Sequence, residues 1–101
     1  MDYDALADQA RPALILAAMR RTTVTYGELA KSISFDTSIP LSHHMKRVLD
    51  RVSDRCIKAG EPSLAVLVVN ADTGVPGDGF TEGSLTWMAE ARKCFKRWSP
   101  A

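Results

Sequence analysis

Apolar side chains recur every three or four positions in four stretches of the chain, which predicts four amphipathic helices. These stretches are residues 4–21, 26–33, 42–59 and 85–98. Each turns an apolar stripe inward, and we expect Met19, Ile57 and Met88 to lie on or beside these stripes with the more regular core positions. The chain is therefore predicted to be mostly helical.

Capping residues mark several helix ends. Thr25 and Glu28 have the spacing of a capping box, and Ser42 and Ser84 are expected to cap the third and fourth helices. Gly60 stands where a helix C-terminus favours a left-handed residue. Pro12 lies inside the first pattern, so it predicts either a kink or the true first turn of that helix.

Strand signals are few. Residues 64–69 (LAVLVV) form a continuous apolar run, which predicts a strand covered on both faces, and residues 22–24 suit a very short extended piece. Residues 70–79 hold three glycines, a proline and two aspartates, a composition typical of a turn. The predicted class is α+β, with four helices and one main strand or small hairpin.

Length and composition indicate a single domain. The 101 residues are 46% hydrophobic and 25% charged, as in an ordinary globular domain. We expect a first helix in residues 1–21, a core in 22–80 and a last helix in 81–101. The formal net charge of +1 is no global signature of a nucleic-acid binder, so any such signal has to come from local clusters.

Localisation and cofactors are predicted from what the sequence lacks. Cys56 and Cys94 form no CxxC pair, so we expect small buried side chains and neither a metal nor a cofactor. The acidic start of the chain does not resemble a signal peptide, and the longest apolar run, residues 13–19, is too short for a bilayer. A soluble, cytoplasmic monomer or weak homodimer without membrane contact is expected.

The order of these elements resembles a winged helix-turn-helix. Residues 24–30 (VTYGELA) are similar to the segment that opens the DNA-binding half of alkylguanine-DNA alkyltransferases and alkyltransferase-like proteins. The resemblance implies a groove helix at residues 45–58, an extended segment at 64–69 and a wing at 73–80 (TGVPGDGF), with Gly77 and Gly79 near the nucleic acid. The chain is also similar to small uncharacterised bacterial proteins, some encoded near restriction or phage-defence genes.

The chain departs from the alkyltransferases at their catalytic motif. That family needs a reactive cysteine in a Pro-Cys-His-Arg sequence, and the matching residues here are Leu64, Ala65, Val66 and Leu67. No nucleophile, base or acid stands there. We therefore predict no enzymatic activity, since a hydrolase would also need a nucleophile and base at a recognisable spacing.

The third helix carries a basic stripe along one side. It consists of Arg47, Arg51, Arg55 and Lys58, with His43 and His44 in the first turn. Such a stripe can contact phosphates while its first residues reach base edges. Asp50 and Asp54 run beside it, however, so a salt-bridged solvent face with exposed histidines is the alternative.

The last helix carries a second basic cluster. It contains Arg92, Lys93, Lys96 and Arg97, interleaved with Trp87, Phe95 and Trp98. Cations over aromatic rings can hold RNA or single strands, and two tryptophans can also anchor a protein interface. A solvated basic face without a partner is the third possibility.

Two functions remain open from the sequence. The first is a non-enzymatic nucleic-acid-binding module, with DNA as the favoured ligand, that uses the stripe on the third helix and the wing. The second is a protein-interaction module, such as a small inhibitor, an immunity-type protein or a phage-defence accessory protein, that uses Trp87, Arg92, Lys96 and Trp98.

Overall fold

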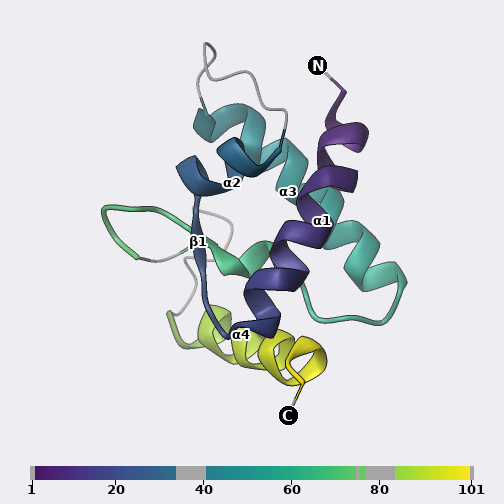
Figure 1. The fold of residues 1–101 in the computed structure, drawn as a ribbon, viewed down its shortest axis with the longest axis vertical. Helices are drawn as coiled ribbons and strands as arrows, with labels where there is room; N and C mark the ends of the chain where they lie inside the picture. The colour runs from purple at the N-terminus through teal and green to yellow at the C-terminus, as the bar shows by residue number, and fades with distance from the viewer. Residues whose placement is uncertain (1, 34–40, 75, 77–83, 101) are drawn as a thin grey trace.

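The described part of the chain is a small, mostly helical α+β domain. A computed structural model describes residues 2–33, 41–74, 76 and 84–100, with the backbone alone at 41–43 and 84–86. In these residues it contains four α-helices, a short 3₁₀ helix and a two-stranded sheet (Figure 1). In chain order they are α1 (Tyr3–Met19), β1 (Val24–Thr25), α2 (Tyr26–Ser32), α3 (Leu41–Lys58), η1 (Leu64–Leu67), β2 (Val68–Val69) and α4 (Ser84–Trp98).

Helix α1 begins at Tyr3 because Asp2 caps it, its carboxylate accepting the Ala5 amide at 3.0 Å. The helix continues through Pro12, so the expectation that Pro12 marks the first turn is wrong. Leu6 and Leu14 on the predicted stripe are buried. Met19 is 43% exposed, because the stripe turns away from the core as the helix ends.

Helices α2 and α3 largely follow the predicted pattern. The Thr25–Glu28 capping box is present, and the Thr25 backbone amide holds the pKa of the Glu28 carboxyl below its ordinary value. The predicted stripe of α3 is buried from Met45 to Cys56. Ile57 is 68% exposed, since its neighbour Cys56 takes the inward position. Ser42 lies inside α3, which begins one residue before it.

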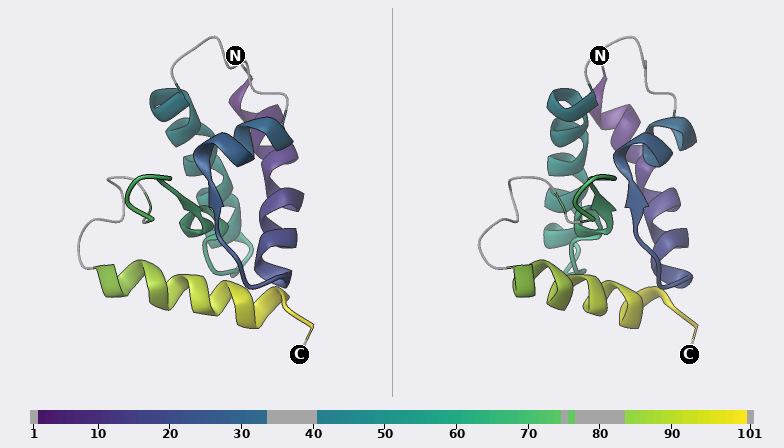
Figure 2. Two further views of the ribbon diagram at one scale, coloured as in Figure 1. Left: turned by 60° about the vertical axis from the view of Figure 1, so that its left-hand side comes forward. Right: turned by 90° about the vertical axis from the view of Figure 1, so that its left-hand side faces the viewer.

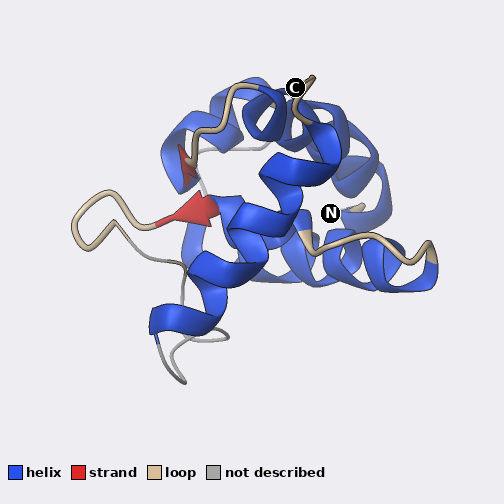
Figure 3. Cartoon of the chain, turned by 90° about the horizontal axis from the view of Figure 1, so that it is seen from below, coloured by secondary structure: helices blue, strands red, loops and turns tan. Residues whose placement is uncertain are grey.

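The predicted strand over residues 64–69 is wrong for its first four positions. Residues Leu64–Leu67 form η1, and only Val68–Val69 extend as β2. β2 pairs in parallel with β1, Val24 opposite Val68, so the strands are joined by a crossover through α2 and α3 and form no hairpin (Figure 3). Every η1 residue is buried because η1 packs against α1, α3 and α4.

Helix α4 lies across the ends of the other elements. Helices α1 and α3 run side by side with η1 near them, and α4 crosses below the end of α1 (Figures 1 and 2). Ala91 and Cys94 face the core, and Trp87, Phe95 and Trp98 pack at its edge. Met88 is 40% exposed, because it lies about 60° around the helix from Ala91 and about 120° from Cys94, the two residues that face the core.

Candidate nucleic-acid interface

The structure places half of the basic stripe of α3 against acidic residues of α1. Arg51 Nε lies 3.0 Å from Asp4 Oδ1, and Arg55 Nη2 lies 3.6 Å from the same oxygen. Arg55 also donates a hydrogen bond to Asp8 Oδ1. Arg51 and Arg55 therefore have intramolecular carboxylate partners that compete with any phosphate.

The first residue of the stripe, Arg47, lies beside Tyr3 of α1. The guanidinium groups of Arg47 and Arg51 lie 5.7 and 5.0 Å from the centre of the Tyr3 ring, at cation–π distance. The Tyr3 hydroxyl hydrogen-bonds His44 Nδ1 at 2.7 Å, and the two rings stack 6.1 Å apart. His44 thus helps to hold α1 to α3, and the side chain of His43 lies outside the described residues.

The open side of α3 carries mixed charge. Its exposed charged residues are Lys46, Arg47, Asp50, Asp54 and Lys58. Three cations beside two carboxylates leave little net attraction for a polyanion, because each carboxylate offsets a cation within about one helical turn. This surface matches the salt-bridged alternative more closely than a phosphate-binding stripe.

The outer side of α4 carries cations without this compensation. Arg92 and Lys96 are exposed one turn apart on α4, and Arg20 and Arg21 are exposed just after α1, which packs against α4. Arg21 Nε links the two segments by donating to Ser99 Oγ at 3.2 Å, one residue after α4 ends. We call Arg20, Arg21, Arg92 and Lys96 the cationic face.

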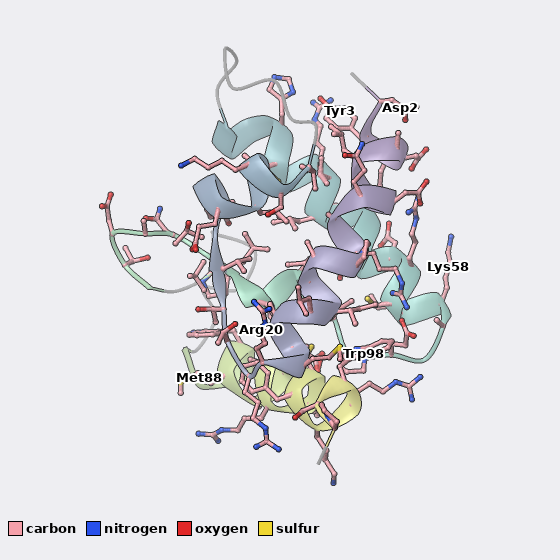
Figure 4. The ribbon with its side chains drawn as sticks, viewed as in Figure 1. Asp2, Tyr3, Arg20, Lys58, Met88 and Trp98 are labelled. Carbon is pink, nitrogen blue, oxygen red and sulfur yellow. The ribbon has the colours of Figure 1, made fainter. Side chains whose placement is uncertain are left out.

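No described residue forms an ion pair with a member of the cationic face. Figure 4 shows Arg20 just above α4, and Asp2 and Tyr3 at the other end of α1. Four exposed cations thus flank the contact between α1 and α4, although the net charge of the chain is only +1. Arg20 and Arg21 end the helix predicted at residues 4–21, so the sequence alone did not join them to either basic cluster.

Arg21 holds an unfavourable backbone conformation. Its φ is 57°, and the amides of Arg21 and Thr22 bond to the carbonyls of Ala18 and Ala17, which defines a Schellman motif. Helix α3 ends in the same motif with Gly60 at the equivalent position, at φ 71°. Glycine is the residue that this position favours, so the arginine at residue 21 costs stability. Retaining a strained residue is typical of a functional site.

Replacing Arg21 by glycine is expected to stabilise the fold by roughly 0.5–1 kcal/mol and to weaken nucleic-acid binding about threefold. Glycine relieves the left-handed strain, while the substitution removes one cation from the cationic face. Urea unfolding and fluorescence anisotropy with a labelled oligonucleotide measure the two effects.

The matched control is Gly60→Ala, which introduces the strain that Arg21→Gly removes. No atom lies within 4 Å of the Cβ that Gly60→Ala would add, so its expected cost of about 1 kcal/mol isolates the backbone term. Only the free energy of unfolding is compared in this control, because Gly60 stands outside the cationic face. Unchanged binding of the Arg21→Gly variant would instead remove Arg21 from the interface.

Trp87 and Trp98 pack inward. Both are half-buried against the core, and their buried indole Nε1 atoms have no hydrogen-bond partner among the described residues. Arg11 and Arg97 lie 5.6 and 5.5 Å from the Trp98 ring centre. Trp98 thus fastens α4 to α1 and leaves little ring surface for a partner.

Neither cysteine is suited to act as a nucleophile. Cys56 and Cys94 are free and fully buried. Burial, with smaller contributions from Glu90 and Cys56, raises the pKa of the Cys94 thiol to about 12. The thiolate is the reactive form of a cysteine, and a pKa near 12 leaves almost no Cys94 thiolate at neutral pH. Leu64, Ala65, Val66 and Leu67, where the sequence resemblance would have placed a catalytic motif, are apolar and buried in η1.

Metal-binding clusters and membrane-spanning helices are absent from the described residues. There, no three histidine, cysteine, aspartate or glutamate side chains are grouped to hold a metal ion. No described helix has the length and apolar character needed to cross a bilayer. Gly77 and Gly79, expected in the wing, lie outside the described residues.

The chain was compared with known proteins. It matches no protein-family model, no curated protein and no solved structure.

Proposed function

We propose that this chain is a non-catalytic domain that binds the phosphate backbone of a nucleic acid through its cationic face. The observation that carries the proposal is the exposure of Arg20, Arg21, Arg92 and Lys96 on α4 and at the adjoining end of α1, without ion-pair partners among the described residues. Arginine and lysine contacts to phosphate oxygens supply most of the affinity in sequence-independent binding.

A winged-helix relationship is part of this proposal. Helices α2 and α3 follow one another, and η1, β2 and a turn with Gly74 at φ 70° come next, the order of a helix-turn-helix with a wing. We place the main phosphate contacts on the cationic face and not on α3, because Arg51 and Arg55 of α3 already pair with Asp4 and Asp8.

The protein-interaction alternative has less support. An interface anchor needs an aromatic side chain that a partner can bury, and Trp87 and Trp98 are already packed against the core. The buried cysteines and the apolar η1 favour a binding role over catalysis.

Salt dependence tests the proposal. We expect the full chain to bind single-stranded or duplex oligonucleotides at about 50 mM salt, with log K falling against log salt at a slope of roughly −3 to −4. That slope corresponds to about four phosphate contacts, one for each member of the cationic face. Fluorescence anisotropy from about 50 to 200 mM salt measures it. Absence of binding at low salt, or a slope near zero, would contradict the proposal.

A further inference from the structure

A shallow hollow lies beside α4, next to the cationic face. Its volume is about 420 Å³, and it is lined by residues 60–62 after α3 and by Glu90, Lys93, Lys96 and Arg97 of α4. Lys93 and Arg97 project from the side of the helix away from Arg92. Lys96 belongs to both surfaces, so the hollow continues the cationic face.

The charge of the hollow suits a doubly charged anion. Glu61 is neutralised by Arg11, whose Nη2 lies 2.8 Å from Glu61 Oε1, and the Glu61 side chain is only 8% exposed. The other charged side chains that line the hollow are those of Lys93, Lys96 and Arg97 and the carboxylate of Glu90. The Glu90 carboxylate lies 3.8 Å from Lys93 Nζ. Two positive charges are therefore uncompensated.

Arg97 is held in place before any ligand binds. Its guanidinium lies 5.5 Å from the Trp98 ring centre, and its Nη2 lies 3.8 Å from Glu61 Oε2, beyond ordinary hydrogen-bond length. The ring restrains the guanidinium while its N–H donors keep the capacity to bind a ligand. A restrained guanidinium matches the planar, bidentate geometry of phosphate recognition.

We propose that this hollow binds the terminal phosphate of a nucleic-acid strand, an inference that rests on the proposed function. A terminal phosphomonoester carries a charge of about −1.5 to −2 at pH 7, which matches the two uncompensated charges, whereas an internal phosphodiester carries only one. Arg97 takes two phosphate oxygens, Lys93 and Lys96 contact the others, and the strand continues over the cationic face.

Competition binding with three oligonucleotides of one sequence tests the inference. They carry a 5′-phosphate, a 3′-phosphate or hydroxyls at both ends, and each displaces an internally labelled strand. We expect one phosphorylated strand to bind roughly tenfold more tightly than the unphosphorylated strand, with a smaller preference at pH 5, where the phosphate loses its second charge. If all three strands bind with equal affinity, the terminal-phosphate site is overturned and the proposed function stands. If no strand binds, the proposed function itself is overturned.

Two variants on neighbouring positions of α4 separate the hollow from the cationic face. Lys93→Gln is expected to reduce the preference for the phosphorylated strand to less than about threefold, with at most a twofold loss for the unphosphorylated strand. Arg92→Gln, which lies outside the hollow, should weaken all three strands alike and keep the preference. The inference is overturned if Lys93→Gln keeps the preference for the phosphorylated strand, or if Arg92→Gln removes it. Both side chains are exposed, so neither variant is expected to unfold the chain.

Discussion

Replacing Arg92 and Lys96 by glutamine is expected to weaken nucleic-acid binding at least about tenfold near 100 mM salt and to reduce the salt slope by about 1.5 to 2. Each side chain is exposed on α4 without an ion-pair partner among the described residues, so each can release one counterion from a bound phosphate. Anisotropy titrations at several salt concentrations give both quantities. The free energy of unfolding should change by less than about 0.5 kcal/mol.

The matched control removes two cations from α3. Lys46 and Lys58 are exposed, and the double substitution Lys46→Gln/Lys58→Gln makes the same change in net charge. We expect its effect on affinity to stay within about twofold, because Asp50 and Asp54 already weaken the potential over that helix. Equal losses in the two double variants would mean that overall charge controls binding. A larger loss in the α3 variant would restore α3 as the interface.

Replacing Leu67 by alanine is expected to lower the free energy of unfolding by about 2–5 kcal/mol. Leu67 is fully buried in η1, which packs against α1, α3 and α4, so truncation leaves a cavity where three helices meet. Domains of this size are stable by only about 5–15 kcal/mol, and the loss is therefore a large share of the total. Urea unfolding followed by circular dichroism measures it.

Leu16→Ala provides the control for this experiment. Leu16 lies on α1 and is 45% exposed, so the same substitution there should cost less than about 1 kcal/mol. If the two variants lost similar stability, η1 would not form part of the core. The two variants thus test η1, which the sequence predicted to be part of a strand.

Local sequence signals predicted most of the helical structure. The spacing of apolar residues located four helices, and the Thr25–Glu28 capping box and Gly60 marked two of their ends within a residue. These predictions hold because capping and helical periodicity depend on residues a few positions apart. The buried state of Cys56 and Cys94 followed from the same periodicity.

The run at residues 64–69 shows where local reasoning fails. A short, continuously apolar segment has no period, so a buried strand and a buried 3₁₀ turn have the same sequence pattern. Contacts with α1, α3 and α4 decide between them, and Val68 extends because it pairs with Val24. The same limit explains Ile57 and Met88, since periodicity locates an apolar stripe but does not define its edges.

For the candidate interface too, some features could be predicted from the sequence and others required the tertiary structure. The sequence by itself determined that α3 and α4 are basic, because both clusters lie within single helices. Only the tertiary structure decided which cations keep their charge available, because Asp4 and Asp8 reach Arg51 and Arg55 across 47 positions in the chain. It also brought Arg21 to Ser99, 78 positions away, and so joined the end of α1 to the end of α4. Coulomb interactions act through space at close range, and proximity between distant residues is created only by folding.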